Sequence, residues 1–352
     1  MDFLTIRDVN VRNKVVMVRA DLNVPVENGE VRSDLRLRAS LPTLEMLREK
    51  GAKKIIVISH LGRPEGRDKT LSLGPVAEWM DKEIGNVKFV DDVSGPDVEA
   101  AVTKMKAGEI LVLENLRFFG GEKRNSSDFI REIIDTTGAE IYVQDGFSVC
   151  HREHASVVAV AEQLPVYAGL LLEKEVKNLS LAIKKPERPF LVIIGGAKVE
   201  DKKPLIEHFA KIADMVAVGG KIAVEGYVGN ENVYTAEDFD EDGEGRKLDV
   251  GPVATSKIAG MIADAKTIIW NGLLGKAEDA AYATASTIVA EMMGEKSEAK
   301  TIVCGGDTAG FVEEVMQEHP TLDYSLISTG GGASLEFLLG KELPGLLVIE
   351  QK

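Results

Sequence analysis

Short apolar runs alternate with longer amphipathic stretches along the whole chain. Runs of four to six residues rich in Val, Ile and Leu, such as 15–18, 55–58 and 190–194, are typical of strands buried in a parallel sheet. The stretches between them, such as 41–50, 128–138 and 308–319, place apolar residues at helical spacing. This alternation predicts an α/β protein with doubly wound parallel sheets.

The two halves of the chain differ in the residues that follow their apolar runs. The first half places Asp, Asn, His and Arg there, and the second places Gly-Gly, Lys, Asn and Asp. Ligands of open α/β sheets bind at the carboxyl ends of the strands. We therefore expect a small anion in the first half and a phosphate chain in the second. The joint is residues 164–189, whose apolar spacing is helical and which ends at KKPERP.

Length and composition narrow the class of protein. The chain has 352 residues, which suits two domains of ordinary size, and a net charge of −15, which argues against a nucleic-acid or membrane-surface binder. Two cysteines cannot form a disulfide framework and favour a reducing compartment. The first residues lack the apolar core of a signal peptide, and no apolar run approaches the length of a membrane helix. These features predict a soluble cytoplasmic protein.

The arginines are concentrated in one half. Thirteen of the fifteen lie in residues 1–165. Arginine grips a phosphate or carboxylate with a planar fork that lysine lacks. A single arginine is most often part of a surface ion pair, but several at one sheet edge predict a multiply charged anion. Carboxylate and amide groups beside them suit a hydroxyl group of the same ligand. The candidate residues are Arg19, Asp21, Asn23, Arg36, His60, Arg63, Arg117, His151 and Arg152.

The segment DGFSVCHREHAS, residues 145–156, raises the possibility of a metal site. It holds Cys150, His151 and His154, but half of a four-ligand zinc site is missing elsewhere, and Arg152 among them repels a cation. We therefore expect no zinc here and an anion beside Arg152. His154 is also open to a purely structural role at the start of the next apolar stretch.

Three glycine-rich turns in the second half favour a nucleotide. FLVIIGGAKVEDKK, TIVCGGDTAG and ISTGGGASLEF each join an apolar run to a helix start, where backbone N–H groups can cradle phosphate. Asp307 can hold the Mg²⁺ of a nucleotide. A single glycine pair most often marks a tight turn. Three glycine-rich turns that also carry lysine and aspartate together favour a site for nucleotide phosphates. The chain has neither a P-loop motif nor the dinucleotide fingerprint.

These motifs together resemble the phosphoglycerate kinase family along almost the entire chain. The resemblance rests on VRADLNVP, SDLRLRASLPT, SHLGRP, LENLRF, HREHAS, RPFLVIIGGAKVEDK, WNG, GGDT and STGGGASLEFLLGKELPG. It implies two Rossmann-like domains joined by an interdomain helix, and a monomer. The implied boundaries are 1–165 for the 3-phosphoglycerate domain, 166–189 for the helix and linker, 190–340 for the nucleotide domain and 341–352 for a tail.

The resemblance also implies the reaction and its residues. The family transfers a phosphoryl group between 1,3-bisphosphoglycerate and Mg-ADP, and ligands on separate domains imply a closure that excludes water. Arg36, Lys198 and Gly331 match catalytic positions. Positions matching the 3-phosphoglycerate site are Asp21, Leu22, Asn23, Arg36, His60, Leu61, Gly62, Arg63, Arg117 and Arg152. Those matching the nucleotide site are Lys198, Lys202, Gly219, Asn271, Glu278, Gly305, Gly306, Asp307 and Thr308, with Asp307 at the metal.

The chain departs from the family pattern beside the expected nucleotide base. The stretch 221–251 is shorter by some tens of residues, and Leu273, Lys276 and Ala277 replace usual residues of the family. If the missing residues formed a wall of the pocket for the nucleotide base, the chain should bind all bases weakly and with little selectivity. The alternative is that residues 221–251 form a shorter wall that lies equally close to the base. Two other functions stay open at this point. One is a different acyl-phosphate or sugar-acid kinase on the same scaffold, and the other is a homologue that binds ligands without turnover.

Overall fold

The computed structural model describes residues 3–351, apart from the side chain of Asp201. The chain divides into two compact units. One comprises the chain through Val176 together with the segment from Glu342 onward, and the other comprises Lys177–Lys341. In residues 3–351, no helix has the length and apolar composition needed to cross a membrane.

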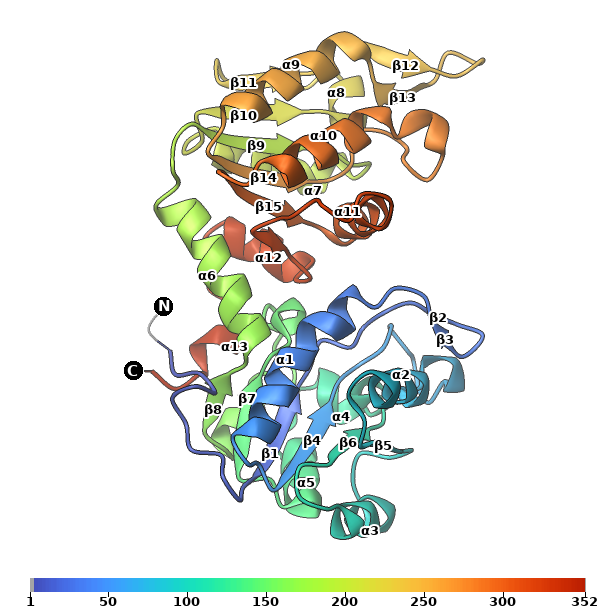
Figure 1. Cartoon of the computed structure of the whole chain (residues 1–352), viewed down its shortest axis with the longest axis vertical. Helices are drawn as coiled ribbons and strands as arrows, with labels where there is room; N and C mark the ends of the chain where they lie inside the picture. The colour runs from blue at the N-terminus through green and yellow to red at the C-terminus, as the bar shows by residue number, and fades with distance from the viewer. Residues whose placement is uncertain (1–2, 352) are drawn as a thin grey trace. The chain divides into compact units, whose positions relative to one another are not determined.

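The first unit is built on a six-stranded parallel sheet in the order β5-β6-β4-β1-β7-β8 (Figure 1). Its strands are β1 (Val15–Arg19), β4 (Lys54–Ile58), β5 (Val87–Val90), β6 (Ile110–Leu113), β7 (Ile141–Gln144) and β8 (Val166–Ala168). Its helices are α1 (Leu35–Glu49), α2 (Gly74–Ile84), α3 (Pro96–Lys104), α4 (Gly120–Lys123), α5 (Ser127–Thr137) and α13 (Pro344–Leu347). A small hairpin joins β2 (Val26–Glu27) and β3 (Glu30–Val31), and short 3₁₀ helices occupy Lys69–Leu71, Leu116–Phe118, Phe147–Val149 and Ala159–Glu162.

Alternation along the central strand explains why both faces of this sheet are covered. All five residues of β1 are buried, and Val16 and Val18 join Leu44 of α1 in one core cluster, whereas Met17 is buried outside that cluster. Successive strand side chains point to opposite faces. Helices on both faces therefore remove the strand from water, as the continuous apolar run predicts.

The second unit repeats the architecture in the order β11-β10-β9-β14-β15-β16, again fully parallel. Its strands are β9 (Phe190–Ile194), β10 (Met215–Val218), β11 (Val233–Thr235), β14 (Thr267–Asn271), β15 (Lys300–Cys304) and β16 (Leu326–Ile327). Its helices are α7 (Val199–Phe209), α8 (Gly220–Val224), α9 (Pro252–Asp264), α10 (Thr284–Glu295), α11 (Gly306–Glu318) and α12 (Gly332–Leu338), with a 3₁₀ helix at Ala280–Tyr282. A separate antiparallel hairpin joins β12 (Phe239–Glu241) and β13 (Lys247–Val250).

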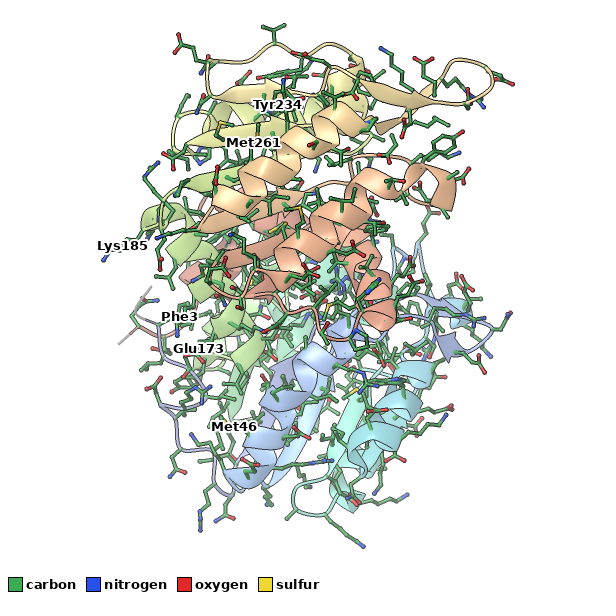
Figure 2. All side chains as sticks on the ribbon, turned by 45° about the horizontal axis from the view of Figure 1, so that its top comes forward. Phe3, Met46, Glu173, Lys185, Tyr234 and Met261 are labelled. Atoms are coloured by element: carbon green, nitrogen blue, oxygen red, sulfur yellow. The ribbon has the colours of Figure 1, made fainter. Side chains whose placement is uncertain are left out.

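The expected fold class is confirmed, and the apolar runs 15–18, 55–58 and 190–194 form strands β1, β4 and β9. The joint at 164–189 needs a correction, because it begins with strand β8 before helix α6 (Leu170–Lys184). Val166 and Ala168 are buried against β7. The Asp145 carboxylate then accepts hydrogen bonds from the N–H groups of Leu171 and Leu172, at 2.9 and 3.2 Å, and starts the helix. Lys185, just beyond α6, is exposed and extends into solvent (Figure 2).

The segment after Glu342 returns to the first unit. The N–H of Gly345 donates to the carbonyl of Cys150 at 2.9 Å, and the N–H of Glu350 donates to the carbonyl of Val166 at 2.9 Å. A Cβ at residue 345 would lie 2.9 Å from Cys150 Cα, so only glycine allows this approach. The last helix, α13, therefore belongs to the unit in which the chain began.

Candidate functional site

Cationic side chains gather at the carboxyl edge of the first sheet. The neighbouring strands β6, β4, β1 and β7 end there. Arg19 is the last residue of β1, Arg117 lies in the 3₁₀ helix after β6, and the imidazole of His60 follows β4 beside them. Burial lowers the pKa of Arg117 to about 10, with the charges of Arg19, Arg152 and Arg63 adding to the effect. So much like charge around one buried guanidinium is favourable only against an anion.

Arg36, on α1, reaches this cluster through a buried carboxylate. Its Nη1 donates to Oδ2 and Oδ1 of Asp21 at 2.9 and 3.1 Å, and the hydroxyl of Ser148 donates to the same Oδ1 at 2.9 Å. The Asp21 side chain is fully buried, whereas that of Arg36 is 22% exposed. Asp21 therefore fixes the guanidinium while leaving its outer edge open. The sequence pattern gave no sign of the contact from Ser148.

The loop that follows β4 is braced from two sides. The side-chain oxygen of Asn23 accepts a hydrogen bond from the N–H of Gly62 at 2.8 Å, and Arg117 Nη1 donates to the Gly62 carbonyl at 2.7 Å. The side chains of Leu22 and Leu61 belong to the apolar core, so only their backbone can face a ligand. The structure thus brings together most of the residues expected around the anion, and the expected Arg19 lies beneath them with its side chain buried.

The segment 145–156 does not assemble metal donors. Cys150 is completely buried, and burial raises the pKa of its thiol, which disfavours the thiolate that zinc needs. His154 Nδ1 lies 3.6 Å from Oε1 of the buried Glu122. In residues 3–351, no group of three or more His, Cys, Asp or Glu side chains is placed to hold a metal ion. Arg152, in the same segment, adds its positive charge to the surroundings of Arg117 and lowers the pKa of that guanidinium.

Protein purified without added metal should contain zinc well below one equivalent per chain. Elemental analysis by mass spectrometry checks this, with a Cys150→Ala variant as the control. Stoichiometric zinc that disappears in the variant would contradict the anion interpretation of this segment.

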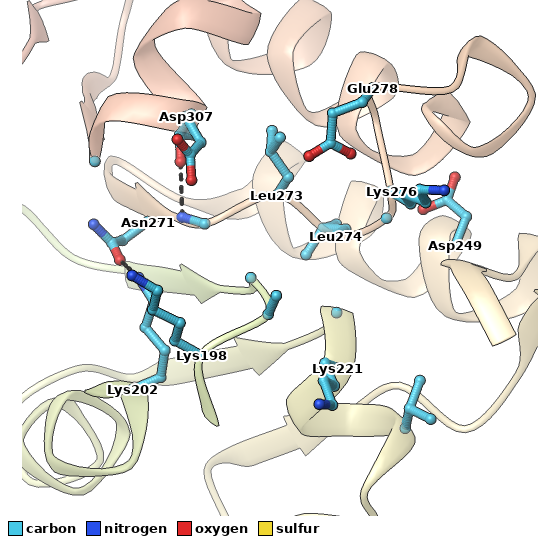
Figure 3. A pocket seen from close by; sticks show the side chains of 18 of the residues that line it. Lys198, Lys202, Lys221, Asp249, Asn271, Leu273, Leu274, Lys276, Glu278 and Asp307 are labelled. Carbon is cyan, nitrogen blue, oxygen red and sulfur yellow. Dashed lines mark hydrogen bonds between the residues drawn. The ribbon is translucent and has the colours of Figure 1, made fainter. Parts of the chain in front are cut away.

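The second unit contains a cavity of about 860 Å³ at the carboxyl edge of its sheet (Figure 3). Residues 196–198, 271–276 and 305–308 line it, together with the start of α12. Of the expected nucleotide-site residues, Gly219 alone does not line the cavity; it packs on Leu274, and Gly220 lines the wall instead. The other expected residues, which do line it, are Lys198, Lys202, Asn271, Glu278, Gly305, Gly306, Asp307, Thr308 and Gly331.

One end of this cavity is built from cationic groups and helix starts. The ammonium of Lys202 donates to the Asn271 Oδ1, while the Nδ2 of Asn271 is buried without a hydrogen-bond partner in residues 3–351 (Figure 3). The hydroxyl of Thr308, in the first turn of α11, accepts from the N–H of Gly272 at 2.9 Å. Gly305 has a φ of +97°, and a Cβ there would lie 3.2 Å from the amide nitrogen of Asn271. The buried amide of Asn271 and a helix N-terminus at one point suit phosphate oxygens.

The hairpin β12–β13 forms the wall at the other end. Phe239 and residues 245–249 line the cavity, and the ammonium of Lys247 lies 4.6 Å from the centre of the Phe239 ring. The carboxylate of Asp249 accepts from the N–H groups of Val250 and Ala285 at 2.8 and 3.0 Å, and burial raises its pKa. Lys276 N–H donates to the carbonyl of Leu248 at 2.8 Å, which ties the wall to the loop after β14. The shortened segment 221–251 therefore still provides a wall of the cavity.

Comparison with known proteins places the chain beside one family. A family model described as phosphoglycerate kinase matches residues 6–232 and 225–341. Phosphoglycerate kinases of Moorella thermoacetica and Coprothermobacter proteolyticus are 38% and 39% identical to the chain, and each alignment covers 99% of it and at least 99% of the relative. These alignments span 397 and 402 positions, so the relatives carry some tens of residues that this chain lacks. The match to the family model is divided into two ranges that overlap at residues 225–232, within the shortened segment.

Solved structures agree with the sequence comparison. The phosphoglycerate kinase of Coxiella burnetii is 32% identical with a TM-score of 0.79, and that of Pyrococcus horikoshii is 27% identical with a TM-score of 0.87. Each comparison covers 98% of both chains. The similarity therefore extends over both units.

Proposed function

The chain belongs to the phosphoglycerate kinase family, and we propose that the two sites described above carry out this family's reaction. The protein is an ATP-dependent phosphotransferase of glycolysis with a carboxylate acceptor. The reaction is reversible phosphoryl transfer between 1,3-bisphosphoglycerate and ADP. We also propose which residues hold each of the two substrates, and the geometry of the two sites supports this assignment.

The first unit binds 3-phosphoglycerate in this proposal. The observation that carries it is the set of cationic side chains around the fully buried Asp21. Arg63, Arg117 and Arg152 suit the phosphate group, and His60 adds a hydrogen-bond donor. Asp21 suits the hydroxyl, and the open edge of Arg36 suits the reacting carboxylate. That carboxylate is ionised at neutral pH, so the reaction needs no general base.

The second unit binds the nucleotide, with the phosphates at the end that holds Lys198, Lys202 and the start of α11. Mg²⁺ is commonly held by one or two carboxylates together with substrate phosphate oxygens. Asp307 is exposed in the first turn of α11 and lines the cavity, so its carboxylate fits that role. The ion, when bound, would neutralise charge on the phosphate oxygens. Lys198, Arg36 and the backbone N–H groups at Gly331 would neutralise the transferred group itself.

Charge and domain organisation also bear on the binding partners and the oligomeric state of the protein. The net charge of −15 opposes binding to nucleic acid, and the substrates are small molecules. We infer that the protein works as a monomer, because each of the two sites lies within one unit of a single chain. We infer a cytoplasmic location from the glycolytic family and from the small number of cysteines.

A coupled assay of ATP-dependent phosphorylation tests the proposal. The acceptors to compare are 3-phosphoglycerate, 2-phosphoglycerate, glycerate and a phosphorylated sugar acid. Turnover on 3-phosphoglycerate should exceed that on the others by orders of magnitude. A preference for another acid would indicate a different kinase on this scaffold, and ligand binding without any turnover would indicate a non-catalytic homologue.

The rebuilt wall leads to a prediction for the nucleotide base. Val224, on α8, lines the cavity and is 38% exposed. Its replacement by alanine removes apolar contact of about 0.5–1 kcal/mol, which should raise KM for ATP roughly two- to fivefold and leave KM for 3-phosphoglycerate unchanged. Steady-state kinetics with ATP, GTP, CTP and UTP check the effect.

Val228 provides the matched control for this prediction. It is 89% exposed and lies outside the cavity, so Val228→Ala should leave all four nucleotides unaffected. Equal and very weak use of the four nucleotides by the unaltered protein would show that the hairpin does not contact the base.

A further inference from the structure

A buried polar network lies beneath the anion site of the first unit. Arg19, at the end of β1, is 1% exposed, and Glu122 and Ser156 are fully buried. Arg19 Nε donates to the Ser156 hydroxyl at 2.9 Å, and that hydroxyl donates to Glu122 Oε1 at 2.7 Å. The N–H of Ser156 donates to Oε2 of the same carboxylate at 3.1 Å. One serine therefore connects a buried cation to the buried anion that compensates it.

Arg19 also fixes the state of the neighbouring imidazole. Its Nη2 lies 3.0 Å from Nδ1 of His60, which is 3% exposed. A guanidinium is always charged and offers only donors, so Nδ1 of His60 has to accept and cannot carry a proton. A protonated imidazole would place one N–H against another. The proton of the neutral ring is therefore on Nε2.

The remaining contacts of Arg19 hold it in this orientation. Its Nη1 donates to the Ala20 carbonyl and to the Ser59 hydroxyl, both at 3.1 Å. With Ser156 on Nε and His60 on Nη2, the guanidinium has a partner on each of its three nitrogens. A rotation of the group would break several bonds at once, so the imidazole meets a donor of fixed direction.

We propose that Glu122, acting through Ser156 and Arg19, is a positioning residue that holds His60 as the neutral tautomer protonated on Nε2. His60 then presents a directed hydrogen-bond donor to an anionic substrate, and not a charge that changes with pH. The inference rests on the proposed function, because it takes the cluster around His60 as the 3-phosphoglycerate site. The recognition of the anion's charge is left to the arginines.

The surrounding charges act in the same direction. Burial, followed by the charges of Arg19, Arg117, Arg36 and His154, holds the pKa of His60 well below its ordinary value. These four groups lie on β1, the 3₁₀ helix after β6, α1 and the loop after β7. A histidine with a lowered pKa stays neutral as the pH falls through the range in which an ordinary imidazole gains its proton.

Nitrogen-15 NMR of the histidine side chains in the ligand-free protein tests the tautomer directly. The His60 signals should show one protonated nitrogen, Nε2, and should not change between pH 8 and pH 6. His319, whose side chain is half exposed, provides the internal reference. A proton on Nδ1, or a doubly protonated ring at pH 7, would overturn the proposal.

The variant Ser156→Ala tests the link to Glu122, because it removes one oxygen atom and keeps both charges. We expect the Kd for 3-phosphoglycerate to rise about three- to tenfold, the effect of one lost hydrogen bond, while the Kd for ADP stays the same. The ratio of variant to unaltered Kd should also change between pH 8 and pH 6, because His60 becomes able to take a proton. The substrate's own titration cancels in that ratio.

Thr137→Val is the matched control, since it removes a buried hydroxyl of α5 whose partners in residues 3–351 are helix carbonyls. It should leave both dissociation constants unchanged.

An unchanged His60 tautomer and an unchanged affinity for 3-phosphoglycerate in Ser156→Ala would contradict the proposed role of Glu122. If 3-phosphoglycerate fails to bind the unaltered protein, the proposed function fails, whereas the tautomer is judged separately by NMR. If Ser156→Ala does not fold, the nitrogen-15 spectrum of the unaltered protein still decides which nitrogen of His60 carries the proton.

Discussion

Replacing Arg36 with alanine should lower kcat by about 10²- to 10³-fold, the effect of losing one preorganised charge at the transferred group. Arg36 sits on α1 with Asp21 at 2.9 Å and keeps its outer edge open. Charge spreads over the phosphoryl oxygens during transfer, so the interaction strengthens in the transition state. Coupled assays at saturating 3-phosphoglycerate and ATP measure the change in kcat.

Two further variants make this result interpretable. Arg38 lies on the same helix, is paired with Asp34 and Glu83 and is 54% exposed, so Arg38→Ala should leave kcat unchanged. The single Arg36 variant also leaves buried Asp21 without its cation, and the double variant Arg36→Ala with Asp21→Asn separates that cost from the loss of catalysis. An Arg36→Ala enzyme within a few-fold of the unaltered one would remove Arg36 from the chemistry.

The second large effect is expected at Asp307. Asp307→Asn should weaken binding of Mg-ADP by roughly ten- to a hundredfold, because a neutral amide replaces the carboxylate proposed to hold the Mg²⁺. Binding of 3-phosphoglycerate should not change, since its residues lie on the other unit. Calorimetric titration of each ligand alone gives both numbers.

Glu318, at the far end of α11, offers the control for this change. Its side chain is exposed and lies outside the cavity, so Glu318→Gln should bind both ligands normally. An equal loss of both ligands in Asp307→Asn would contradict the assignment of the two substrates to separate units.

The sequence predicts the framework of both sites because the framework depends on local patterns. Continuous apolar runs mark the strands, and the residues that follow them meet at one edge of each sheet. Arg117 and His60 at the first edge, and Asn271 and Asp307 at the second, were therefore predictable without knowledge of the contacts. Strand β8 was not, because three residues next to a helical pattern give too short a signal.

Other features depend on contacts that no local pattern encodes. The acidic run 237–244 has the composition of a solvated loop, yet Asp242 accepts the N–H groups of Glu244 and Arg246, both at 2.9 Å, and turns it into a hairpin. That hairpin carries Phe239 to the cavity wall. The bridge from Arg19 to Glu122 joins residues that lie more than a hundred positions apart, through Ser156. Only the folded chain brings these groups together.

The central claim is that the γ-phosphoryl group of ATP is transferred to the carboxylate of 3-phosphoglycerate. The most direct measurement traps the product with hydroxylamine, which attacks an acyl phosphate and leaves a stable hydroxamate. We expect a hydroxamate that forms only when the protein, Mg-ATP and 3-phosphoglycerate are all present, in amounts equal to the ADP released. Release of ADP without hydroxamate, or no release at all, would contradict the account.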